Sequence, residues 1–150
     1  MTKRVSLDTN ILVYAVDSIG DKSETAARLL RSAALAEALL TQQVIGEFLN
    51  VSRRMPHLDQ PRLRRIAVGL CTTFAIVPTP RDLLFGAFDR AARFGLQYWD
   101  SVIVSVCIAN AVGVLLSEDM QDGLSIDGIM IVNPFNPDNR ERVRELLAPR

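Results

Sequence analysis

The sequence predicts an α/β fold in which helices surround a mostly parallel sheet of four to five strands. Short apolar runs alternate with longer segments whose apolar residues recur at helical spacing. The 150 residues are 49% hydrophobic, which is enough for one core. We therefore expect a single domain over residues 1–150.

The expected strands are short runs rich in Val, Ile and Leu. Continuous apolar runs of this kind are typical of strands that helices cover on both faces of a parallel sheet. In chain order we expect strands at Val5–Leu7, Ala38–Thr41, Ala75–Val77, Val114–Ser117 and Ile129–Val132.

Longer segments between these runs are expected to be helices. One of them has Ala26, Leu29 and Ala33 at helical spacing, and Gly95 and Gly113 are expected to end two others. In chain order the expected helices are Asn10–Val16, Ser23–Glu37, Gln43–Arg54, Pro61–Thr73, Pro80–Phe94 and Tyr98–Val112, and the tail with Arg140, Arg142 and Arg144 is expected to end in a helical turn.

Cysteine usage and hydropathy favour a cytoplasmic protein. Cys71 and Cys107 lie in apolar helical segments without a partner at metal-ligand spacing, so we expect both to be small buried hydrophobes. The longest apolar stretch, Val102–Leu116, falls short of the roughly 18 to 20 residues that span a bilayer, so no membrane segment is expected. Asp8 and Asn10 interrupt the apolar run that an export signal would need.

Two acidic residues follow expected strands. Asp8 comes directly after the first strand and Asp119 two residues after the fourth. Both are therefore expected at the carboxyl edge of the sheet, where open α/β sheets bind ligands. Ordinary turn chemistry is the alternative for Asp119 and Asp122, because Asp is frequent in turns near Gly.

Two further acids lie on helices with apolar faces. Glu47 lies roughly 70° from the centre of its apolar stripe, and an ion pair with Arg53 or Arg54 is its alternative explanation. Asp100 shares a stripe with Ile103, and its alternative is a helix cap.

Four carboxylates that meet at one sheet edge need a positive partner. At about 4 Å apart, each pair would repel by roughly 4 kcal/mol at an effective dielectric of 20. A hard divalent cation is the simplest neutraliser, and ligands that are all oxygen select Mg²⁺ or Mn²⁺.

Net charge leaves nucleic-acid binding open. The formal net charge is zero, from 17 basic and 17 acidic residues, which argues against a general nucleic-acid binder. If four acids bind metal, the remaining charged residues are 13 acidic and 17 basic. Of the basic residues, 15 are Arg, the side chain suited to phosphate recognition. Solvated helix faces explain the same composition equally well.

The acids sit in specific sequence contexts. These are Asp8-Thr9-Asn10, the mid-helix Glu47, Tyr98-Trp99-Asp100-Ser101, and the segment Leu116–Gly123 followed by Ile131–Phe135. Over nearly the whole chain, this ordered set resembles the PIN domain family, and within it the VapC-type bacterial toxins.

The resemblance implies a PIN-like three-layer α/β/α sandwich and a Mg²⁺-dependent endoribonuclease that hydrolyses RNA by metal-activated water. It also implies a cognate antitoxin that holds the enzyme inactive, and a homodimer. Carried over residue by residue, the catalytic metal-binding acids would be Asp8, Glu47, Asp100 and Asp119, with Asn10 and Ser117 as supporting polar residues and Asp122 as an accessory acid.

Other mechanisms fit less well. A ribonuclease that uses paired imidazoles is excluded, because His57 is the sole histidine. Phosphoacceptor α/β proteins need a lysine beside the acid, and neither Lys3 nor Lys22 is expected beside a later strand. Two alternatives stay open: a PIN-type nuclease of RNA processing without an antitoxin, and a non-catalytic interaction module on the same fold.

Overall fold

The computed structural model describes residues 3–17 and 19–149 and contains a six-stranded sheet in the order β3-β2-β1-β4-β6-β5. The strands β1, β2, β3, β4 and β6 are parallel, and β5 is antiparallel to β6. The α/β prediction is confirmed, but its strand count was too low because β5, with two residues, is too short to show a pattern. The strands are β1 (Arg4–Leu7), β2 (Leu39–Thr41), β3 (Ala75–Val77), β4 (Val112–Leu116), β5 (Ser125–Ile126) and β6 (Ile129–Val132).

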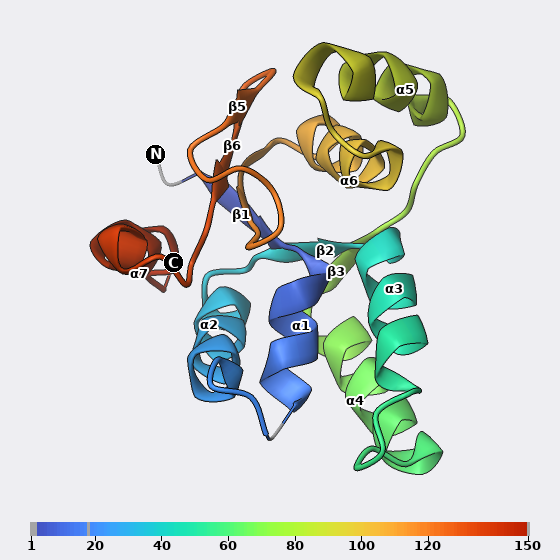
Figure 1. Ribbon diagram of the computed structural model, residues 1–150, viewed down its shortest axis with the longest axis vertical. Helices are drawn as coiled ribbons and strands as arrows, with labels where there is room; N and C mark the ends of the chain where they lie inside the picture. Colours follow the sequence, from blue (N-terminus) through green and yellow to red (C-terminus); the bar gives the residue numbers. More distant parts are fainter. Residues whose placement is uncertain (1–2, 18, 150) are drawn as a thin grey trace.

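Helices cover both faces of the sheet, as expected. In Figure 1, α1 to α4 lie on one side of the strands, and α5 and α6 lie on the other. The helices are α1 (Thr9–Val16), α2 (Ser23–Leu35), α3 (Gln42–Ser52), α4 (Gln60–Thr73), α5 (Leu83–Phe94), α6 (Tyr98–Ala109) and α7 (Arg140–Leu146), with a 3₁₀ turn η1 (Pro137–Asn139) before α7.

The centre of the sheet is the pair β1 and β4. Val5 pairs with Val114 and Leu7 with Leu116, and all four side chains are buried. Burial on both faces explains why these strands are continuous apolar runs rather than alternating ones. The register brings the residues that follow Leu7 and Leu116 side by side.

The end of α6 differs from the prediction. The helix stops at Ala109 instead of Val112, because Ala111 adopts a left-handed conformation with φ 58° and turns the chain into β4. Gly113 is therefore a strand residue, and a Cβ there would lie 2.9 Å from Cβ of Lys3. Glycine at this position permits close packing rather than ending a helix.

The two cysteines have different environments. Cys107 is buried, as predicted, whereas Cys71 is exposed on α4, so the prediction for Cys71 was wrong. Gly95 ends α5 with φ 66°, as expected. Across the described residues, no helix combines the length and the apolar character needed to cross a membrane.

Candidate active site

The register of β1 and β4 places Asp8 beside Ser117. The backbone N–H of Asp8 donates to the carbonyl of Leu116 at 2.9 Å. The hydroxyl of Ser117 donates to Oδ2 of Asp8 at 2.7 Å, and the N–H of Thr9 donates to Oδ1 at 2.7 Å. Asp8 is 5% exposed and caps α1, so its carboxylate is fixed at the carboxyl edge of the sheet.

Glu47 reaches the same region from α3. The hydroxyl of Thr9 donates to its Oε2 at 2.9 Å, and Nε2 of Gln43 donates to its Oε1 at 2.7 Å. The same Gln43 nitrogen donates to the carbonyl of Trp99 at 3.0 Å, which ties α3 to the start of α6. In the described part of the chain Glu47 forms no ion pair with an arginine, so that alternative was wrong.

Asp100 and Asp119 complete the group. Gln97 occupies the N-cap of α6 and Asp100 lies in the first turn, so the capping alternative was wrong. Asp119 lies in the bend that follows β4, and its Oδ2 accepts a hydrogen bond from Nδ2 of Asn10 at 3.1 Å. The two supporting residues, Asn10 and Ser117, therefore each contact one of the four acids.

The four acids repel one another. Burial raises the pKa of Asp8 to about 6, and the charges of Asp100 and Asp119 add to this rise. Burial followed by the charges of Glu47 and Asp119 raises the pKa of Asp100. Among residues 3–17 and 19–149, none of the ion pairs includes any of these four carboxylates. The region is therefore an acidic cluster whose carboxylates are not ion-paired within the described residues.

The donor chemistry fits a hard cation. Besides the carboxylates, the region contains two buried amide oxygens, Oδ1 of Asn10 and Oε1 of Gln43. Neither oxygen has a hydrogen-bond partner among the described residues, and both are of the type that binds hard cations. As the side chains lie, no three acidic, His or Cys side chains of the described ranges stand close enough to hold a metal ion. Binding would therefore require side-chain rotation, which no hydrogen bond from the described residues opposes at the carboxylate of Asp100.

Asp122 is not brought into this group. Its carboxylate accepts hydrogen bonds from the N–H of Asn133 at 2.8 Å and from the side chains of Asn136 and Asn139, both at 2.9 Å. Burial acts in the opposite direction, but these donors outweigh it and lower the pKa of Asp122. Its contacts hold the loop between β6 and η1.

Three residues near Asp119 were missed from the sequence. Nζ of Lys22 pairs with Oε2 of Glu118, and the hydroxyl of Tyr14 donates to Oε1 at 2.8 Å. Burial opposes ionisation of Glu118, but these two donors prevail and lower its pKa. The expectation that no lysine lies beside a later strand was wrong, because Lys22 contacts the residue before Asp119. The spacing of Asn10 and Tyr14 on one helix face was the available signal.

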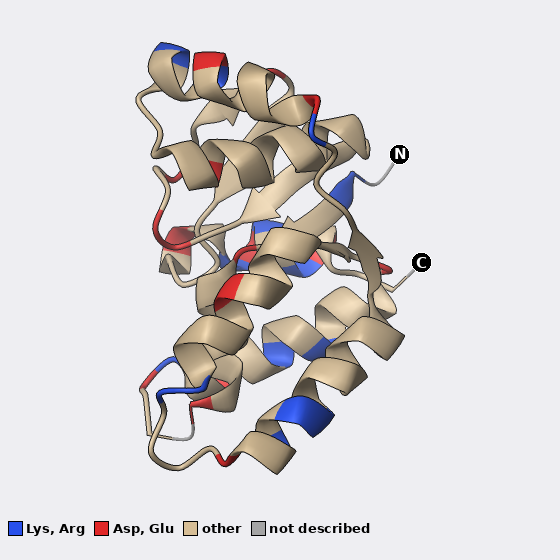
Figure 2. Ribbon diagram, turned by 90° about the vertical axis from the view of Figure 1, so that its right-hand side faces the viewer, with Lys and Arg blue, Asp and Glu red and all other residues tan. Residues whose placement is uncertain are grey.

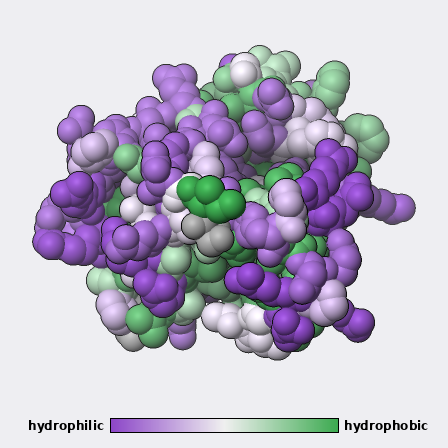
Figure 3. All heavy atoms as spheres, turned by 60° about the horizontal axis from the view of Figure 1, so that its bottom comes forward, coloured by the Kyte–Doolittle hydropathy of each residue, from purple (hydrophilic) through white to green (hydrophobic). Residues whose placement is uncertain are grey.

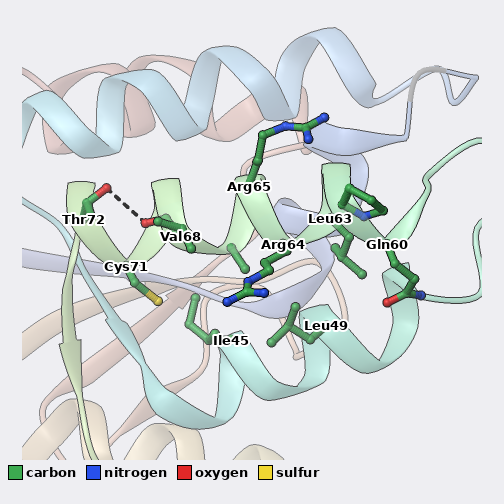
Figure 4. Close-up of a pocket in the computed structure, with 11 residues that line it drawn as sticks. Ile45, Leu49, Gln60, Leu63, Arg64, Arg65, Val68, Cys71 and Thr72 are labelled. Atoms are coloured by element: carbon green, nitrogen blue, oxygen red, sulfur yellow. Dashed lines mark hydrogen bonds between the residues drawn. The ribbon is translucent and has the colours of Figure 1, made fainter.

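A groove of about 1000 Å³ lies between α3 and α4. Its floor is apolar, with Ile45, Leu49, Leu63 and Val68 among the lining residues. Figure 4 shows Arg64 reaching from α4 over the groove. None of the lining residues belongs to the acidic cluster, so this groove is a separate feature.

Basic and acidic residues both occur on several elements of the fold. In the view of Figure 2, several basic segments lie on the helices at the lower right, and segments of both signs lie elsewhere along the ribbon. Figure 3, which brings the side of α1 to α4 forward, shows a mostly hydrophilic face with separate hydrophobic patches.

The fold and the cluster together define an α/β protein with an acidic site at the carboxyl edge of a parallel sheet. The chain belongs to the PIN domain family, because a sequence model of the PIN domain matches residues 5–121. This range includes all four acids and ends before Asp122. A comparison with curated proteins gives no match.

Solved structures share the fold at low sequence identity. VapC20 of Mycobacterium tuberculosis, described as a sarcin–ricin loop cleaving toxin, has a TM-score of 0.63 and 19% identity over 77% of this chain and 89% of its own. A toxin–antitoxin complex from Klebsiella pneumoniae has a TM-score of 0.64 and 18% sequence identity, over 87% of this chain and 98% of its own. FitAcB from Neisseria gonorrhoeae has a TM-score of 0.64 and 15% sequence identity, over 88% of this chain and 99% of its own. At these identities the similarity establishes the fold.

Proposed function

We propose that this PIN domain is a Mg²⁺-dependent endoribonuclease that hydrolyses RNA phosphodiester bonds with water as the nucleophile. The observation that carries the proposal is the convergence of four carboxylates from four elements at one sheet edge, none of which forms an ion pair within the described residues. The description of VapC20 as a cleaving toxin supports a cleavage activity for this fold.

Asp8, Glu47, Asp100 and Asp119 would hold Mg²⁺, for which Mn²⁺ would substitute. When bound, the ion would lower the pKa of a water molecule and neutralise charge on the phosphate. Hydrogen bonds orient two of these four side chains: Thr9 contacts both Asp8 and Glu47, and each oxygen of Asp8 accepts one hydrogen bond.

Cleavage of total cellular RNA with and without EDTA tests the proposal. We expect cleavage to need Mg²⁺ or Mn²⁺ and to leave 5′-phosphate and 3′-hydroxyl ends, since water makes the 2′-hydroxyl unnecessary. Asp8→Asn protein purified in parallel controls for contaminating ribonuclease. Full activity of metal-stripped protein in EDTA would contradict the proposal.

We also propose that the nuclease is a toxin that a small antitoxin holds inactive. One structural neighbour is described as a toxin–antitoxin complex from Klebsiella pneumoniae. The acidic cluster suits an Arg or Lys supplied by a partner.

Expression of the chain alone should arrest bacterial growth, and co-expression of the antitoxin should reverse the arrest. The Asp100→Asn variant should be harmless. Harmless expression of soluble wild-type protein would favour the RNA-processing alternative.

We further propose a cytoplasmic homodimer. Phe85 and Phe88 on α5 and Trp99 at the start of α6 are 82%, 67% and 61% exposed, an unusual exposure for aromatic side chains. The molar mass from light scattering tests this for the wild type and for the Phe85→Ser/Phe88→Ser double variant. We expect a dimeric wild type and a monomeric double variant. A monomeric wild type would exclude the dimer.

A further inference from the structure

The segment that carries Asp119 has little backbone support of its own. Residues 117–120, the 117–120 turn, follow β4 and form neither helix nor strand. The N–H of Ser117 donates to the carbonyl of Val132 at 3.0 Å, and the N–H of Met120 donates to the Ser117 hydroxyl at 3.3 Å. Both contacts lie at the ends of the turn, so side-chain contacts decide where Asp119 sits.

One face of α1 contacts two successive residues of this turn. Asn10 donates to Asp119 and Tyr14, one helical turn later, donates to Glu118 at 2.8 Å. Lys22, at the start of α2, holds the other oxygen of Glu118. Both oxygens of Glu118 are therefore occupied by donors from outside the acidic cluster.

Aromatic rings fix the lysine itself. Nζ of Lys22 lies 5.3 Å from the ring centroids of both Tyr14 and Phe135. The two rings pack edge to face with centroids 5.4 Å apart. Cation–π contact with two rings and an ion pair to Glu118 restrict a normally flexible side chain. We name Tyr14, Lys22, Glu118 and Phe135 the lysine clamp.

We propose that the lysine clamp positions Asp119 for metal binding, an inference that rests on the proposed metal-dependent function. Asp119 lies close to another acid, since the hydroxyl of Ser117, which begins the same turn, donates to the carboxylate of Asp8 at 2.7 Å. Repulsion without a metal ion would push the turn away from the cluster. By gripping the neighbouring residue, the clamp opposes this displacement. Its members are positioning residues that do not touch the reacting atoms.

Lys22→Met tests the clamp, and Arg28→Met is its matched control. The control removes a different ion pair, the exposed one between Arg28 and Glu24 at 2.8 Å within α2. Lys22→Arg should restore the pairing with Glu118. Tyr14→Phe keeps the ring and removes only the hydroxyl donor, so it tests the clamp if Lys22→Met folds poorly.

We expect Lys22→Met to speed amide hydrogen exchange of the 117–120 turn in metal-free protein. Calorimetry should show Mn²⁺ affinity lower by about 10-fold, the size typical of a lost outer-shell contact. With RNA, kcat should fall more than KM changes. Lys22→Arg should recover most of each effect, Tyr14→Phe should show a smaller one, and Arg28→Met should match the wild type.

Unchanged exchange in Lys22→Met would overturn the clamp, and faster exchange with unchanged Mn²⁺ affinity would overturn its role in metal binding. A wild type that binds no Mn²⁺ would overturn that role as well. A wild type that binds Mn²⁺ but cleaves no RNA would contradict the proposed nuclease alone, because exchange and calorimetry still decide the inference.

Discussion

Asp8 and Asp127 are the same side chain in opposite surroundings. Asp127, in the turn between β5 and β6, accepts hydrogen bonds from Arg90 at 2.9 Å and from Arg93 at 2.6 Å. The hydrogen bond from Arg90 has the largest effect on the pKa of Asp127, and together with Arg93 it lowers that pKa. Burial, in contrast, raises the pKa of Asp8 to about 6. Asp127 is paired with two cationic donors, whereas the hydrogen bonds that Asp8 accepts come from the neutral donors Thr9 and Ser117.

The paired region also has a structural task. Nη1 of Arg90 donates to the hydroxyl of Ser105 on α6 at 2.6 Å, and Ser101 of the same helix donates to the carbonyl of Ala87 on α5 at 2.7 Å. Asp127 therefore joins the hairpin of β5 and β6 to α5 and α6. This difference predicts that substitutions in the two regions have opposite effects on activity and stability.

The largest contrast should be in activity. Asp8→Asn or Asp100→Asn should reduce RNA cleavage by more than about 100-fold, since even an outer-shell partner is worth about 10- to 100-fold. Asp127→Asn should cleave RNA at the wild-type rate but unfold at a lower temperature. Cleavage rates and thermal unfolding of the three variants check this, and equal loss of activity in all three would break the comparison.

The pH dependence of stability should differ in sign. Because the folded pKa of Asp8 lies near 6, above the ordinary value of 3.8, stability of metal-free protein falls as pH rises between these values. The change is on the order of 2 to 3 kcal/mol. Asp127 and Asp122, with lowered pKa values, instead lose stabilisation as pH falls below their ordinary range.

Urea unfolding from pH 4 to 7 should therefore show a decline that Asp8→Asn reduces. A metal-free Asp8→Asn protein less stable than the wild type at pH 7 would show that the hydrogen bonds of the Asp8 carboxylate outweigh its burial and the repulsion from the other acids. Asp127→Asn, measured alongside, should leave the decline between pH 4 and 6 unchanged.

Asp122→Asn should have a smaller effect, confined to stability. The amide loses part of the hydrogen bonding with Asn133, Asn136 and Asn139, which should lower the free energy of unfolding by about 1 kcal/mol. RNA cleavage should be unaffected, because Asp122 lies outside the acidic cluster. A loss of cleavage as large as that of Asp8→Asn would show that Asp122 takes part in the active site.

The smallest effect should come from Arg93→Met. Arg93 is exposed, and solvent and salt screen its pairing with Asp127. The melting temperature should fall slightly at low salt and match the wild type at high salt. A difference that persists at high salt would show that Arg93 contributes through packing.

Local patterns predicted most of the fold. The alternation of apolar runs and helical segments predicted the parallel sheet, and two strands, Ala75–Val77 and Ile129–Val132, have the predicted bounds. Local patterns failed where a single residue sets the end of a helix or where a strand is very short. β5 has two residues, and the turn at Ala111 depends on a left-handed backbone that alanine rarely adopts.

The acidic positions could be predicted because strand ends and helix faces are local properties. The structure brings Asp8, Glu47, Asp100 and Asp119 within electrostatic reach of one another, while their role in binding metal stays a prediction. The contact of Lys22 with Glu118 joins residues 96 positions apart, and no local pattern encodes such a pairing. The assignment of single donors to each acid needed the three-dimensional structure.

The central claim is that the four carboxylates without a cation form one divalent-cation site, and thermal unfolding during a Mg²⁺ titration tests it most directly. The melting temperature of the wild type should rise with Mg²⁺, because a ligand that binds the folded state stabilises it by mass action. Asp8→Asn and Asp100→Asn should start at an equal or higher temperature in metal-free buffer and respond little, whereas Asp127→Asn should respond like the wild type. A wild-type melting temperature that does not change with Mg²⁺, or an equal rise in all four proteins, would contradict the claim.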